Sequence, residues 1–87
     1  NVLFGLKKPD LAVWVFRRNV ALYPGSANVY DSLGDAFVAK GDTAAAKAEF
    51  TRAVDVATRT GHPILAESRR KLRELEGAVA NGRARPE

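Results

Sequence analysis

The sequence contains no cysteine and no methionine, and only a single histidine, among its 87 residues. Without cysteine there can be no disulfide and no thiolate-bound metal, and one histidine cannot form the clusters that hold zinc. A glycine-rich loop of the phosphate-binding kind is missing as well. We therefore expect the chain to hold neither a metal nor another cofactor.

Long apolar runs and a strong charge imbalance are also missing. No segment approaches the ~18–20 consecutive apolar residues that a membrane-spanning helix needs, so we expect no membrane partner. The net charge is only +4, and it is spread along the chain. A nucleic-acid surface needs a denser basic stripe with interleaved aromatic residues. The four basic residues that come nearest to such a stripe are Arg69, Arg70, Lys71 and Arg73. Nucleic-acid binding through them is therefore the third alternative, behind the two functions given below.

The most informative feature that is present is a set of apolar residues that recurs after an interval of 34 residues. Ala12, Phe16 and Val20 recur one interval later as Ala46, Phe50 and Val54. The spacing i, i+4, i+8 places each set of three on one stripe of a helix. A fixed period of this length is typical of a helix-turn-helix repeat that stacks on its own copies.

Turn residues divide the chain into about five helices, which we expect over residues 1–6, 10–22, 27–40, 43–59 and from 64 to between 77 and 80. Breaks are predicted at Pro24-Gly25, at Gly41 and at Gly61-His62-Pro63. Asp42 is expected to cap the helix after it, and Ser26 or Asn28 the helix before. Gly34 lies in the middle of a helix, where glycine costs about 1 kcal/mol relative to alanine, so it predicts close approach by a neighbouring helix.

These helices form one expected domain over residues 1–80, with a partial repeat at 1–26, a complete repeat at 27–60 and a capping helix at 63–80. Residues 81–87 are expected to be a disordered tail. Stacked repeats generally need about three units, and this chain has room for about one and a half. No capping residue is well placed before Val2-Leu3-Phe4, so we expect the first helix to be the end of a longer one and the chain to be a piece of a longer protein.

The complete repeat resembles the tetratricopeptide repeat (TPR). The matching residues are Tyr30, Leu33, Gly34, Phe37, Gly41, Ala46, Phe50, Ala53 and Val54. The repeat departs from the pattern at Thr58, where the closing proline is missing, and the partial repeat departs at Asn19, where a small residue is usual. The resemblance covers residues 3–76 and implies an all-α superhelix of antiparallel helices that binds proteins and is not an enzyme.

The sequence of residues 16–34 is similar to that of bacterial TPRs that end larger proteins, including exported serine hydrolases and esterases. This resemblance implies the C-terminal end of a TPR array and leaves two functions open. The module binds a peptide or protein segment in its concave groove, or it is a structural appendage that packs in cis on a larger enzyme. It would be cytoplasmic if free-standing and exported if attached to a secreted hydrolase.

In TPR arrays the first helix of each repeat lines the groove, which by resemblance places there Asn28, Asp31, Ser32, Asp35 and Val38. Asp31 and Asp35 are four residues apart and share one side of their helix, so they repel each other unless a cation is near. Arg70 or Arg73 is the expected cation. The pair of carboxylates then serves either an internal ion pair or the binding of a basic ligand.

No grouping of residues predicts catalysis. Ser32, His62 and Asp35 could be named as a triad, but a serine inside an amphipathic helix has neither a base nor oxyanion donors beside it. Trp14 is the other residue of interest, because it lies two positions after Ala12 and thus off the apolar stripe. It either packs over its own half repeat or, together with Leu3 and Phe4, docks with the upstream part of the protein or with a second copy of the chain.

Overall fold

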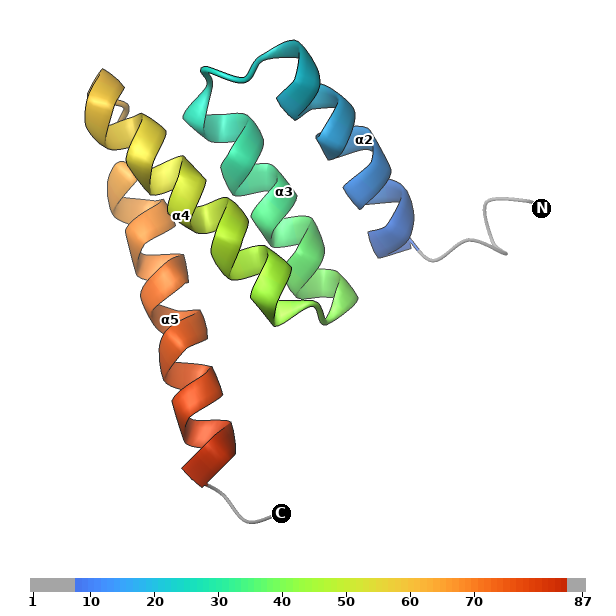
Figure 1. The fold of residues 1–87 in the computed structure, drawn as a ribbon, viewed down its shortest axis with the longest axis vertical. Helices are drawn as coiled ribbons and strands as arrows, with labels where there is room; N and C mark the ends of the chain where they lie inside the picture. The colour runs from blue at the N-terminus through green and yellow to red at the C-terminus, as the bar shows by residue number, and fades with distance from the viewer. Residues whose placement is uncertain (1–7, 85–87) are drawn as a thin grey trace, which may run out of the picture.

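A computed structural model describes the backbone of residues 8–84 and the side chains of residues 8–77. Within that range the helices are α2 (Lys8–Leu22), α3 (Ala27–Lys40), α4 (Thr43–Thr60) and α5 (Leu65–Ala84), and Figure 1 shows each running antiparallel to the next. The all-α prediction is confirmed. The described residues hold four helices where five were expected, because the first predicted helix, over residues 1–6, lies outside them.

The boundary between α3 and α4 follows from two adjacent residues. Gly41 adopts a left-handed conformation with φ of 87°, which a residue without Cβ tolerates at no steric cost. Its amide donates to Val38 O at 3.0 Å and the amide of Asp42 donates to Phe37 O at 2.9 Å, which is the Schellman ending of a helix. Asp42 Oδ1 then accepts a hydrogen bond from the amide of Ala45 at 3.1 Å and begins α4.

The other two turns are held by different means. Ser26 occupies the N-cap of α3 but its side chain makes no capping hydrogen bond, and Asn28, the alternative cap, lies inside the helix. Instead, the Tyr30 hydroxyl donates to Pro24 O at 2.6 Å and ties the first turn to α3. In the last turn Gly61 is left-handed, and His62 Nδ1 accepts a hydrogen bond from the amide of Ile64 at 3.0 Å. The single histidine therefore has a structural role in the turn.

Helix α5 is longer than the sequence predicted. We expected it to end between residues 77 and 80 and the tail to begin at residue 81, but the helix continues to Ala84. Only residues 85–87 of the predicted tail remain, and they lie outside the described range. The pair Asn81-Gly82 costs about 1.5 kcal/mol in helix propensity, which weakens a helix without ending it, and the alanines around the pair favour helix.

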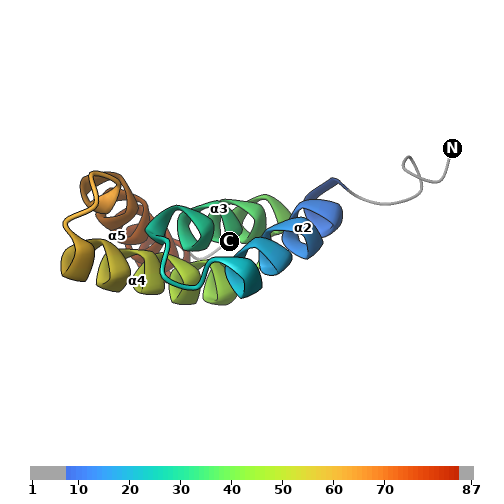
Figure 2. The ribbon, with the colours of Figure 1, turned by 90° about the horizontal axis from the view of Figure 1, so that it is seen from above.

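The helices are arranged in two layers. Figure 2 shows α3 and α5 on one side of the molecule and α2 and α4 on the other. The slab they form measures 42 × 39 × 15 Å, so it is thin. Figure 2 thus places α3 and α5 together in one layer, with α4 in the other.

The core between α3 and α4 confirms the expectation raised by Gly34. A Cβ atom added to Gly34 would lie 2.6–2.8 Å from three ring atoms of Phe50, so only glycine allows this contact. Phe50 is 1% exposed, and Ala46 beside it is fully buried. The equivalent residues of α2 are less covered. There Val13, which we placed beside the stripe, is the buried residue, because among the described residues α2 packs mainly against α3.

Candidate ligand-binding groove

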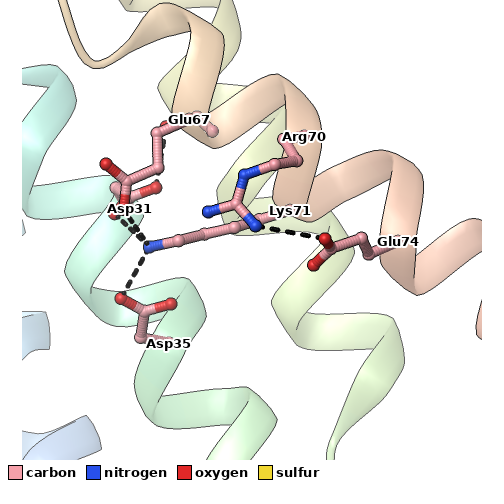
Figure 3. Close-up of polar contacts among 7 residues, drawn as sticks. Asp31, Asp35, Glu67, Arg70, Lys71 and Glu74 are labelled. Carbon is pink, nitrogen blue, oxygen red and sulfur yellow. Dashed lines mark hydrogen bonds and ion pairs between the residues drawn. The ribbon is translucent and has the colours of Figure 1, made fainter.

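Helix α5 is fastened to α3 by polar contacts to one buried carboxylate. Asp31 of α3 is only 5% exposed, and Ser68 of α5 is fully buried. The Ser68 hydroxyl donates to Asp31 Oδ1 at 2.7 Å, and Lys71 Nζ donates to Asp31 Oδ2 at 3.0 Å (Figure 3). Both oxygens of this carboxylate are therefore paired with α5, which satisfies the requirement that a buried charge be hydrogen-bonded.

The ammonium of Lys71 joins three carboxylates. Besides Asp31 it contacts Asp35 Oδ2 at 3.0 Å and Glu67 Oε2 at 3.2 Å, and it lies 5.7 Å from the centre of the Phe50 ring. Burial by itself would lower the pKa of this amine, but the hydrogen bonds to Asp31, Asp35 and Glu67 outweigh burial and raise it above its usual range. Lys71 is thus a fixed cation at neutral pH.

The expectation that Arg70 or Arg73 neutralises Asp31 and Asp35 is wrong. The neutralising cation is Lys71, whereas Arg70 pairs with Glu74 one turn along its own helix, at 3.1 Å (Figure 3). Arg73 is exposed. On a helix, residue 71 points about 100° away from residue 70 and about 160° away from residue 73, so Lys71 and Arg73 cannot both face α3. The same arrangement divides the basic cluster that suggested nucleic-acid binding, since Lys71 points inward and Arg70 is paired.

The surface next to these polar contacts between α3 and α5 is concave. A hollow of about 400 Å³ lies between α3 and α5, and it is lined by Asp35, Val38, Phe50, Arg70, Lys71, Glu74 and Leu75. Phe50, the lining residue from α4, joins those of α3 and α5. Val38 is an apolar side chain that is 45% exposed. The hollow therefore combines an apolar interior with a charged rim.

The ion pairs beside the hollow are acidic as a group although the protein is basic. The Lys71 group and the separate Arg70–Glu74 pair together hold the four carboxylates of Asp31, Asp35, Glu67 and Glu74 against two cations, which leaves a charge of −2. Of these carboxylates, Asp35 and Glu74 line the hollow itself, where Arg70 and Lys71 balance them. The whole chain carries +4. The side chains of Asp35 and Glu74 are also 53% and 62% exposed, so their carboxylates can reach a ligand.

The structure brings together three of the seven predicted groove residues, namely Asp35, Val38 and Arg70. The other four do not line the hollow. Asp31 is buried as described, Ser32 is half-buried, and Asn28 and Arg73 are exposed elsewhere on their helices. Of the predicted docking residues, Trp14 is 60% exposed, whereas Leu3 and Phe4 lie outside the described residues.

Sequence reasoning missed Lys71, Glu74, Phe50 and Leu75 as lining residues and Ser68 as the partner of Asp31. A signal for Ser68 exists. The apolar stripe of α5 contains Leu65, Leu72 and Leu75, and Ser68 occupies the position between Leu65 and Leu72 where the 3–4 spacing calls for an apolar residue. A serine at that position predicts a polar partner on the facing helix, and Lys71 lies on the same side, one turn from Glu67 and Leu75.

Comparison of the chain with protein-family models, with curated proteins and with solved structures found no significant match. Among the described residues, no helix has the length and apolar character needed to cross a membrane. What the chain does must therefore be argued from the groove and from its other surfaces.

Proposed function

We propose that this chain is a non-catalytic protein-interaction module that holds a peptide or protein segment in the groove between α3 and α5. The observation that carries the proposal is the hollow itself, in which the apolar surface of Val38, Phe50 and Leu75 is bordered by exposed carboxylates. A TPR-like stack of antiparallel helices, which the repeat pattern suggests, uses its inner helices in this way. The placement of Asp35 and Val38 in the hollow supports that assignment.

The chemistry of the rim indicates a ligand with an apolar side chain next to a lysine or arginine. The apolar side chain would cover Phe50 and Leu75, and the cation would pair with Asp35 or Glu74. Lys71 does not attract an acidic ligand, because three carboxylates already surround it. An acidic group on the ligand would meet the exposed carboxylates of Asp35 and Glu74, whereas the cations beside them are already paired, and it would be repelled.

Energetics favour an extended ligand over a small molecule. Burying one leucine- or phenylalanine-sized side chain contributes about 1.5–3 kcal/mol, and one exposed charge pair contributes about 0.2–1 kcal/mol. Micromolar affinity requires about 8 kcal/mol. The hollow alone therefore gives weak binding, and a ligand that also runs along α3 and α5 can add the remaining contacts.

The test is a selection of short random peptides displayed on phage against the immobilised 87-residue chain, followed by calorimetric titration of the selected peptides. We expect the selected sequences to place an aromatic or aliphatic residue next to Lys or Arg. Asp35→Ala should weaken the selected peptides by up to about fivefold, since it removes one exposed carboxylate of the rim.

The matched control is Asp55→Ala, which removes a carboxylate that is similarly exposed, at 67%, but lies on α4 and pairs with Arg59 outside the hollow. It should leave peptide affinity unchanged. Failure to select any peptide, or equal loss in the two variants, would remove the support for a groove ligand.

A further inference from the structure

Helix α2 has two apolar faces. One face packs against α3 through Val13, with Ala12, Phe16 and Val20 beside it. The other face is exposed and carries Leu11, Trp14, Val15 and Leu22, whose exposed fractions are 37%, 60%, 39% and 65%. A surface helix normally has one apolar side and one polar side, so this second face needs a separate explanation.

The exposed residues form one continuous stripe. Leu11, Trp14 and Val15 are related by the spacings three and four, and Leu22 lies seven residues beyond Val15, so all four point in one direction. Arg18 lies within the same stripe, and its guanidinium carbon is 5.3 Å from the centre of the Trp14 ring. The stripe is therefore apolar with one cation at its centre.

The surroundings of the stripe are basic as well. Helix α2 contains Lys8, Arg17 and Arg18 against the single carboxylate of Asp10, and of the two arginines Arg17 lies toward α3, 5.7 Å from the centre of the Phe37 ring. Asp10 Oδ1 is itself engaged, at 3.3 Å from Lys40 Nζ on α3. A partner that covers the stripe gains charge complementarity by bringing carboxylates to the neighbourhood of Arg18.

We propose that this stripe, formed by Leu11, Trp14, Val15, Arg18 and Leu22, docks an acidic amphipathic helix of a partner protein. A helix fits because a straight apolar stripe on one helix is completed by the side-chain ridges of a second. Strand addition is not available, since the backbone groups of α2 are already paired within the helix. A second copy that presents the same stripe fits less well, because its own Arg18 would face this one across the contact.

Trp14 makes the proposal directly measurable, because it is the only tryptophan of the chain. The probe is a synthetic peptide of about 18 residues, long enough to be helical, with leucine at 3–4 spacing and glutamate on both sides of the leucine stripe. Docking should shift the Trp14 emission to shorter wavelength in a saturable titration. A matched peptide with lysine in place of every glutamate should bind at least about tenfold more weakly.

Two variants of the protein locate the effect. Arg18→Glu should reverse the preference, so that the lysine peptide binds better than the glutamate peptide. Arg52→Glu is the matched control, since Arg52 is the exposed residue of α4 that stands one 34-residue interval after Arg18, and it should keep the original preference. Asp35→Ala alters the groove and should leave the Trp14 titration unchanged.

Four outcomes overturn the proposal. The first is that the glutamate peptide leaves Trp14 emission unchanged, and the second is that both peptides bind equally well. Emission that shifts with protein concentration alone, together with dimer in sedimentation, shows that a second copy covers the stripe. A shift with vesicles of anionic phospholipid but not with the glutamate peptide assigns the stripe to a lipid surface.

Discussion

Lys71 Nζ lies 3.0 Å from Asp31 Oδ2, and this contact between α5 and α3 is nearly buried on both sides, the two side chains being 18% and 7% exposed. An ion pair in this environment behaves differently from an exposed one. Removing one partner leaves the other charge buried and unpaired, without the hydration it has in the unfolded state, and this destabilises the folded protein. The contact is therefore the point at which the attachment of the last helix can be tested.

Lys71→Met keeps the length of the side chain and removes its charge. Asp31 then retains the Ser68 hydrogen bond but loses its cation, and we expect the free energy of unfolding to fall by about 1.5–3 kcal/mol, the range for a hydrogen bond to a charged group. Urea denaturation followed by circular dichroism measures the change. Lys40→Met is the control, because the Lys40–Asp10 pair is 46% exposed on both sides and should contribute less than about 1 kcal/mol. Equal losses would show that burial of the Lys71 pair has no energetic consequence.

The raised pKa of Lys71 predicts how stability changes at alkaline pH. Below the unfolded-state pKa of about 10.4 the lysine is charged in both states, and its contribution is fully present. Above it the unfolded chain loses a proton that the folded chain keeps, so stability falls, by at most about 1.4 kcal/mol per pH unit. Urea denaturation at pH ~9 and pH ~11 should therefore show a larger loss in the wild type than in Lys71→Met, in which this group is absent. Parallel pH dependence in the two proteins would contradict the raised pKa.

Much of the fold could be predicted because it depends on local chemistry. Gly41 and Asp42 end one helix and begin the next through backbone conformation and a side chain three residues from its partner. Gly34 predicts a close contact because glycine inside a helix lowers helix stability, and close packing by a neighbouring helix can offset that loss. The end of α5 was predicted too early, since Asn81-Gly82 only weakens a helix and no proline stops it there.

The candidate site was less predictable, because it depends on how two helices cross. Asp31 and Asp35 indicated that a cation must be near, but whether residue 70, 71 or 73 supplies it is decided by the rotation of α5 against α3. Such a rotation is set by packing along the whole helix, including half-buried Leu72 and Leu75. A long lysine side chain can also reach in several directions. Only Ser68, a polar residue within an apolar stripe, gave a local signal for the contact.

Gly34→Ala should destabilise the protein although alanine is the better helix former. The gain in helix propensity is about 1 kcal/mol, but the added Cβ would lie 2.6 Å from a ring atom of buried Phe50. Overpacking of this kind costs about 1–3 kcal/mol, so we expect a net loss in thermal or urea unfolding. Gly77→Ala provides the opposite case, since Gly77 lies in α5 with nothing within 4 Å of the position of a Cβ. That variant should be more stable than the wild type by up to about 1 kcal/mol. A stabilised Gly34→Ala protein would contradict the close packing of α3 on α4.

The two helix N-caps provide a prediction in which similar positions give different results. Asp42 Oδ1 accepts a hydrogen bond from the amide of Ala45, so Asp42→Ala should lower the free energy of unfolding by about 0.5–2 kcal/mol. Ser26 occupies the equivalent position before α3 without a capping hydrogen bond from its side chain, and Ser26→Ala should have little effect. The Tyr30 hydroxyl already holds that turn through Pro24 O, so we expect Tyr30→Phe to cost about 1 kcal/mol there. Urea denaturation of the three variants ranks them directly. A loss in Ser26→Ala as large as that in Asp42→Ala would show that the serine, and not the tyrosine, fixes the start of α3.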